Sequence, residues 1–78
     1  MVKISGLKLA QLLNSILYDV EVQSTTSSII ISHKHIDLFI ENDVFDETFI
    51  IIDADGEPVY CSDDHFEAAR QFNLLCSE

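Results

Sequence analysis

Residues 49–60 of this 78-residue chain read FIIIDADGEPVY, and this stretch decides the fold. Its first four residues are aromatic or β-branched, which is typical of a β-strand. The dipeptide Asp55-Gly56 is typical of a two-residue hairpin turn, because Gly accepts a positive φ and Asp tolerates one. Pro58 has no N–H to donate to a neighbouring strand, so the second strand lies at a sheet edge. The stretch therefore predicts an edge hairpin of an antiparallel sheet.

Three more extended stretches precede the hairpin. Residues 20–23 alternate apolar and polar side chains with the period of a strand, and the five hydroxyl side chains of residues 24–28 are typical of a turn. The apolar stretches 29–31 and 36–40 follow. Their pattern fits either one bent strand or two strands, so the sheet has four or five strands in all.

Helices are predicted at both ends of the chain. Between residues 9 and 17, apolar residues recur at spacings of three and four, which predicts a helix that begins after an N-cap at Ser5 and ends near Tyr18 or Asp19. Asp64 and Glu67 have the spacing of a capping box, which predicts a second helix up to Cys76. We therefore predict an α+β fold in a single domain of residues 1–78, with a four- or five-stranded antiparallel meander flanked by an N-terminal and a C-terminal helix.

Two of the predicted strands are apolar on both faces. In a sheet with one covered face, apolar and polar residues alternate, whereas residues 29–31 and 49–52 are apolar throughout. Helices on opposite faces, dimerisation through the sheet and an exposed binding face would each explain this pattern. A domain of this size has a small core and often gains stability from a partner chain, which favours a homodimer.

The charge of the chain is strongly negative and unevenly distributed. Fourteen Asp and Glu residues against four Lys and Arg residues give a formal net charge of -10. Eleven of the acids fall between residues 37 and 67, a segment without Lys or Arg. This charge disfavours direct nucleic-acid binding, which needs basic side chains, and predicts a basic protein partner. The predicted partner-binding residues are Glu41, Asp43, Phe45, Asp46, Glu47, Asp53, Asp55, Glu57, Asp63 and Asp64.

No residue pattern predicts catalysis or a bound metal. On one continuous strand His33, His35 and Asp37 would share a face, but nothing supplies a fourth ligand. Cys61 and Cys76 lack the spacing of a metal or redox motif. We therefore expect no enzymatic activity, no cofactor and no metal.

The composition favours a protein-binding module. Our first hypothesis is a stoichiometric inhibitor or nucleic-acid mimic that occupies a basic surface of a nucleic-acid-binding protein, because carboxylates spaced along a strand have distances comparable to those of phosphates. The size and charge are shared by phage and mobile-element anti-defence proteins of the anti-CRISPR or anti-restriction type. The alternatives are an immunity or antitoxin protein that neutralises a basic nuclease, and a structural homodimer with incidental acidity. We expect a cytoplasmic protein of a bacterial or phage-infected cell, without membrane association.

Overall fold

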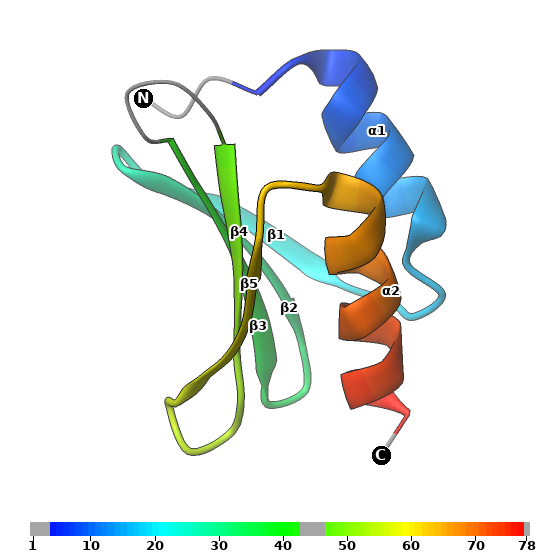
Figure 1. The fold of residues 1–78 in the computed structure, drawn as a ribbon, viewed down its shortest axis with the longest axis vertical. Helices are drawn as coiled ribbons and strands as arrows, with labels where there is room; N and C mark the ends of the chain where they lie inside the picture. Colours follow the sequence, from blue (N-terminus) through cyan, green and yellow to red (C-terminus); the bar gives the residue numbers. More distant parts are fainter. Residues whose placement is uncertain (1–3, 43–46, 78) are drawn as a thin grey trace.

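The computed structural model describes residues 4–42 and 47–77, which form one layer of β-sheet and one layer of helices (Figure 1). The element order is α1 (Gly6–Ser15), β1 (Glu21–Ser24), β2 (Ser28–His33), β3 (Ile36–Asn42), β4 (Glu47–Ile52), β5 (Pro58–Ser62) and α2 (His65–Cys76). All neighbouring strands are antiparallel, and their order in the sheet, β1-β2-β3-β4-β5, is their order in the chain. The predicted α+β meander between two helices is confirmed.

The apolar stretches 29–31 and 36–40, whose pattern fitted one bent strand or two strands, belong to two separate strands, β2 and β3. His33 at the end of β2 is the Cα partner of Ile36 at the start of β3, so only two residues make the turn. Lys34 in this turn has a φ of 54°, in the left-handed region that allows the chain to reverse tightly. The sheet consequently has five strands.

The predicted hairpin between β4 and β5 forms, but its turn is longer than expected. The Asp53 N–H donates to the Glu57 carbonyl at 3.1 Å, and the Gly56 N–H donates to the Asp53 carbonyl at 3.0 Å. Gly56 has a φ of 79°, as in the three-residue loops in which a turn is followed by a left-handed residue. The prediction of a two-residue turn is therefore wrong. The longer loop shifts the register, so that Pro58 is the partner of Ile52.

Helix α1 begins as predicted and ends earlier. The Ser5 Oγ accepts the Lys8 N–H at 3.1 Å, which confirms the N-cap. The last residue of α1 is Ser15, three or four residues before the predicted end at Tyr18 or Asp19. Asn73 of α2 explains the early end: its Nδ2 donates to the Ser15 carbonyl at 2.8 Å, and its Oδ1 accepts the Leu17 N–H at 2.9 Å. A side chain 56 residues away along the chain therefore replaces the next helical turn.

Helix α2 begins at the predicted N-cap, without the full capping box. The Asp64 Oδ1 accepts the Phe66 N–H at 2.9 Å. In a capping box, Glu67 would accept the N–H of Asp64. Instead, that N–H donates to the Ser62 Oγ at 3.0 Å, and Glu67 binds Arg70 at 2.8 Å. The N-cap is confirmed, and the reciprocal half of the box is absent.

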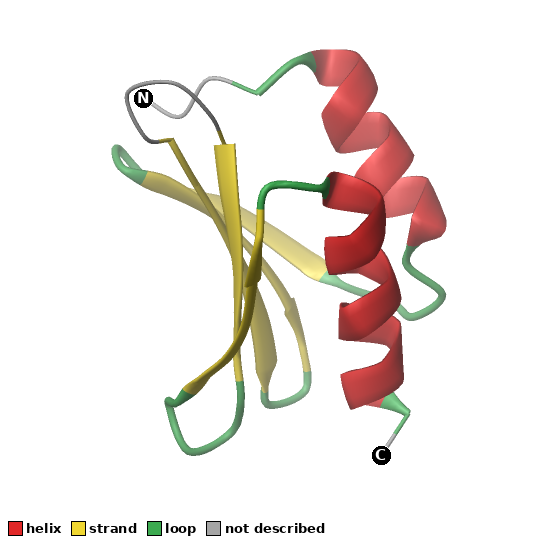
Figure 2. Cartoon of the chain, in the orientation of Figure 1, coloured by secondary structure: helices red, strands yellow, loops and turns green. Residues whose placement is uncertain are grey.

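Both helices lie on the same face of the sheet (Figure 2). Among the described residues, the core between the layers contains eleven buried apolar side chains: Leu12, Ile16, Ile29, Ile31, Leu38, Ile40, Phe49, Ile51, Ala68, Ala69 and Phe72. Every sheet residue in this core projects toward the helices. The explanation that the two helices cover opposite faces of the sheet is therefore wrong. The helices do not account for the apolar side chains on the second face.

Candidate protein-binding surface

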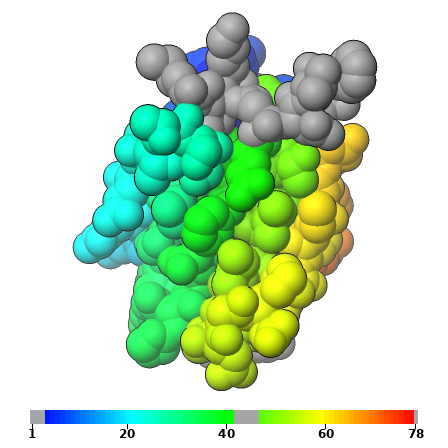
Figure 3. Space-filling model, turned by 90° about the vertical axis from the view of Figure 1, so that its left-hand side faces the viewer, coloured from blue at the N-terminus to red at the C-terminus, as the bar shows by residue number. Residues whose placement is uncertain are grey.

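The face of the sheet opposite the helices is open. Figure 3 looks onto this face: the strands, coloured from cyan to yellow, lie toward the viewer, and no helix of the described residues crosses them. We call this surface the bare face. The cross-strand register shows which side chains project onto it, because residues that are partners in an antiparallel pair share a face.

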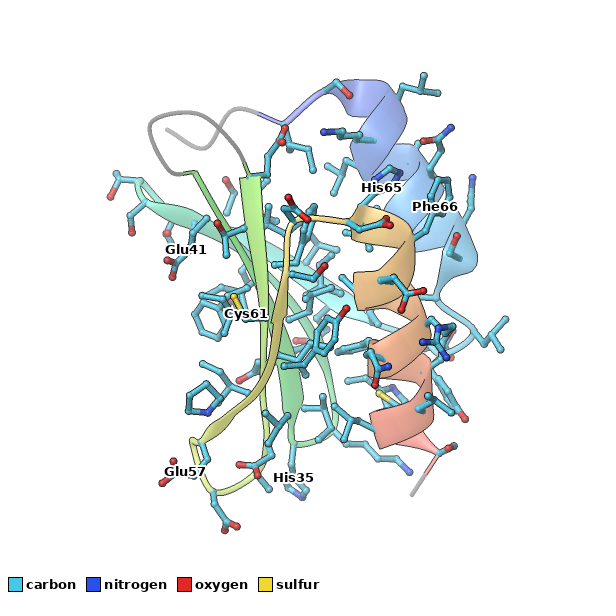
Figure 4. The ribbon with its side chains drawn as sticks, in the orientation of Figure 1. His35, Glu41, Glu57, Cys61, His65 and Phe66 are labelled. Carbon is cyan, nitrogen blue, oxygen red and sulfur yellow. The ribbon has the colours of Figure 1, made fainter. Side chains whose placement is uncertain are left out.

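An apolar row crosses the bare face. Its four members come from β2, β3, β4 and β5 and are consecutive Cα partners: Ile30, Phe39, Ile50 and Cys61. The first three side chains are half-buried by their neighbours in the sheet, and Cys61 is exposed. Figure 4 shows Cys61 projecting away from the helices. Because strands lie about 4.8 Å apart, the row is about 14 Å long. We call these four residues the apolar row.

Carboxylates lie on both sides of the apolar row. On β3, Asp37, Phe39 and Glu41 alternate with inward-facing residues, so all three belong to the bare face. The two acids are about 13 Å apart along the strand, with the aromatic ring between them. The third charged residue of this face is Glu21 on β1, which is also acidic. Among the described residues the bare face therefore combines an apolar centre with negative charge alone.

The ten residues predicted to bind a partner do not gather on one surface. Glu41 is exposed on the bare face (Figure 4). Asp53, Asp55 and Glu57 lie in the β4–β5 turn, whereas Asp63 and Asp64 follow the opposite end of β5. Since β5 spans about 14 Å between these two groups, no single patch contains them. Asp43, Phe45 and Asp46 lie outside the described residues.

Three of these predicted residues have roles within the fold. The Glu47 Oε2 accepts a hydrogen bond from the Lys8 Nζ at 3.1 Å, which links β4 to α1. A backbone hydrogen bond and the Lys8 ammonium hold the pKa of Glu47 below its usual value. Asp53 accepts the N–H groups of Asp55 and Glu57 at 3.0 Å and closes the turn. Asp64 is the N-cap of α2.

The sheet register separates the histidines that could have shared a metal. Because the chain turns at Lys34, His33 projects toward the helices, whereas Asp37 projects onto the bare face. The His33 Nδ1 donates to the Asp19 carbonyl at 2.7 Å, which requires a proton on that nitrogen. His35 lies in the exposed turn at the end of the sheet (Figure 4). Within residues 4–42 and 47–77, no three His, Cys, Asp or Glu side chains are grouped to hold a metal ion.

Two hollows lie on either side of the turn between β2 and β3. The larger, about 400 Å³, is lined by Asp19, Val20, Glu21, Ser32, His33 and Lys34. The smaller, about 190 Å³, is lined by His33, Lys34, His35, Ile36, Ala54, Leu75 and Cys76. The imidazole of His33 in the larger hollow is already bonded to the backbone and lies 5.0 Å from the ring of Tyr18. This contact fastens the segment before β1 to the sheet, which is a structural role.

The two cysteines lie on different sides of the sheet. Cys61 is exposed in the apolar row, and Cys76 is half-buried in α2, on the helical side. Burial raises the pKa of the Cys76 thiol, so less of it is present as the reactive thiolate at neutral pH. This placement excludes a disulfide between them within one chain and makes Cys61 a chemical reporter for the bare face.

Comparison with known proteins adds no relative. No family model, curated protein or solved structure matches this chain. Neither helix in the described part of the chain has the length and hydropathy needed to cross a membrane. The function is therefore inferred from the apolar row and the carboxylates of the bare face.

The sequence predicted two strands that are apolar on both faces, but the predicted partner-binding residues, nine acids and Phe45, did not include Phe39 or Ile50. The sequence contains the pattern that indicates a second apolar face. Alternate residues of a strand face opposite sides of the sheet, and all of residues 49–52 are apolar, so apolar side chains lie on both sides. The sequence did not indicate which face of the sheet each helix covers.

Proposed function

We propose that this chain is a protein-binding module that docks its bare face onto a basic surface of a nucleic-acid-binding protein. The apolar row between Asp37 and Glu41 carries this proposal. Tight association generally needs a desolvated aromatic or aliphatic anchor, and complementary charge around it sets specificity and association rate. Phe39 is the anchor, and the carboxylates on either side attract Lys and Arg of the partner.

The charge of the bare face selects a basic partner over a second copy packed face to face. Two copies in that arrangement would bring Glu21, Asp37 and Glu41 of each chain near one another, without a described basic residue on the face to compensate. Like charges brought together in this way oppose association. A partner rich in Lys and Arg removes this repulsion.

A module that covers a basic surface competes with nucleic acid for it. The proposed activity is therefore stoichiometric inhibition, in the cytoplasm and without catalysis by this chain, of the type by which phage and mobile elements block host defence. The acids of the β4–β5 turn and of the β5–α2 junction add to the long-range negative field of a chain with net charge -10 and speed the encounter. Their distribution over both ends of β5 favours docking through the apolar row over mimicry by one continuous line of carboxylates.

The test compares two variants that each remove a pair of apolar side chains from opposite sides of the molecule. Phe39→Ser/Ile50→Ser changes the bare face. Phe66→Ser/Leu74→Ser changes α2, where these side chains are 51% and 50% exposed. Proteins captured from a host lysate by the wild type are identified, purified and titrated with each variant.

We expect the bare-face variant to bind the captured basic protein about 30-fold more weakly, the effect of losing one aromatic anchor. The helix-side variant should bind it like the wild type. Affinity should fall as the salt concentration rises, and Asp37→Asn/Glu41→Gln should reduce that dependence. Undiminished binding by the bare-face variant, with its fold verified by circular dichroism, would contradict the proposal.

A further inference from the structure

The two edges of the sheet differ in whether they can accept another strand. At the β5 edge, Pro58 lacks an N–H, and the pairing with β4 is irregular between Ile51 and Ile52. Both features block the addition of a strand. At the β1 edge, all four residues from Glu21 to Ser24 are exposed, and the pairing with β2 is regular. Only β1 presents a regular, unprotected edge.

The backbone of β1 has hydrogen-bonding groups that face outward. The Thr25 N–H donates to the Ser28 carbonyl at 2.8 Å, so residue 25 faces β2. In an antiparallel ladder the backbone N–H and carbonyl groups of successive residues point alternately toward and away from the neighbouring strand. Those of Glu21 and Gln23 therefore also point toward β2, whereas those of Val22 and Ser24 point away from the sheet. Within residues 4–42 and 47–77, no strand pairs with the outward groups of Val22 and Ser24.

The sequence of β1 is complementary to itself about a two-fold axis through Val22. In that register each Val22 exchanges two hydrogen bonds with its counterpart, and Val20 pairs with Ser24 of the other copy. The two Val22 side chains, each 48% exposed in one chain, meet on the helical side of the sheet. On the other side, the Glu21 carboxylate of each copy lies opposite the Gln23 amide, a donor for it. No like charges are directly opposed.

We propose that β1 pairs with β1 of a second copy of this chain, forming a two-fold dimer with a continuous ten-stranded sheet. This inference is independent of the proposed function, because the edge is distinct from the apolar row. In the dimer the two bare faces lie side by side on the same surface, so both remain available. The interface joins only short strands, and interfaces well below about 1,000 Å² are weak, so the dimer forms at high protein concentration.

Dimerisation should respond to salt in the direction opposite to that of partner binding. Each copy carries a net charge of -10, so the two chains repel each other at long range. Salt screens this repulsion, and the screening length shortens from about 10 Å at 0.1 M to about 3 Å at 1 M. The dimer therefore becomes tighter as the salt concentration rises, whereas binding of a basic protein becomes weaker.

The experiment is sedimentation equilibrium of the full chain up to about 1 mM protein, the range in which weak self-association is populated. We expect the mass to rise from 8.8 kDa toward twice that value as concentration increases. Val22→Pro removes an outward N–H without removing a bond to β2 and should abolish the rise. Val22→Thr, which keeps the N–H and the branched side chain, should retain it.

Charge variants at Gln23 test the register without changing the backbone. Gln23→Lys places an ammonium group opposite Glu21 twice in each dimer and should tighten it by about two- to thirtyfold, whereas Gln23→Glu should weaken it comparably. Asp55→Asn, in the turn at the other edge, changes the net charge equally to Gln23→Lys and should have a much smaller effect. A strictly monomeric wild type, a folded Val22→Pro variant that dimerises normally, or tighter association of Gln23→Glu would overturn the inference.

Discussion

Phe49 and Phe39 lie on adjacent strands and face opposite sides of the same sheet. Phe49 has no exposed surface and packs in the core under the helices, whereas Phe39 lies in the middle of a face that no described helix covers. The composition of the two faces is similar, since isoleucine and phenylalanine occur on both. Their difference in burial shows that the hydrophobicity of the bare face is not required to hold the two layers together.

The largest expected effect is on stability and separates these two phenylalanines. Phe49→Ala should lower the free energy of unfolding by about 3–5 kcal/mol, because it removes a fully buried ring and leaves a cavity. Phe39→Ala should lower it by about 1 kcal/mol, because the ring is only half-buried. Urea denaturation followed by circular dichroism measures both. Equal losses would contradict the distinction between a packed face and an open one.

A smaller effect separates the carboxylates of the two sides. Glu47 is paired with Lys8, whereas Glu41 is exposed on the bare face. Glu47→Gln should reduce the free energy of unfolding at pH 7 by up to about 1 kcal/mol, and Glu41→Gln should leave it unchanged.

The pH dependence of the Glu47 effect has a definite sign. Since the folded state lowers the pKa of Glu47 from its usual value of about 4.5, the stabilising contribution of Glu47 is complete above that value and is lost as the pH falls through the lower pKa of the folded state. The wild type and Glu47→Gln should therefore converge in stability at acid pH. A difference between them that grows as the pH falls would contradict this assignment.

The contrast between the faces also explains how far the sequence could predict the structure. The strands, the caps at Ser5 and Asp64 and the hairpin around Gly56 depend on local residue chemistry. The sequence predicted them, except for the length of the hairpin turn and the division of the central segment into two strands. The early end of α1 depends on Asn73, a contact that becomes visible only when the two helices pack together. The same packing decides that both helices share one face, so the sequence indicated two apolar faces without distinguishing the covered one.

The candidate site shows the same division between local and tertiary information. The acid-rich segment was apparent from composition, yet Glu47, Asp53 and Asp64 serve the fold through an ion pair, a turn and a cap. In contrast, Phe39 was not selected, because its significance arises from its cross-strand partners Ile30 and Ile50. A row across strands is discontinuous in sequence and requires the register to be known.

The most direct test of the bare face as the binding surface is the rate of thiol alkylation in a saturated complex with the captured basic protein. Cys61 lies in the apolar row, and Cys76 on the helical side is the internal control. We expect complex formation to slow the alkylation of Cys61 at least tenfold, as for a side chain in a desolvated interface, and to leave the slower alkylation of Cys76 unchanged. A complex in which Cys61 reacts as fast as in the free chain would contradict it.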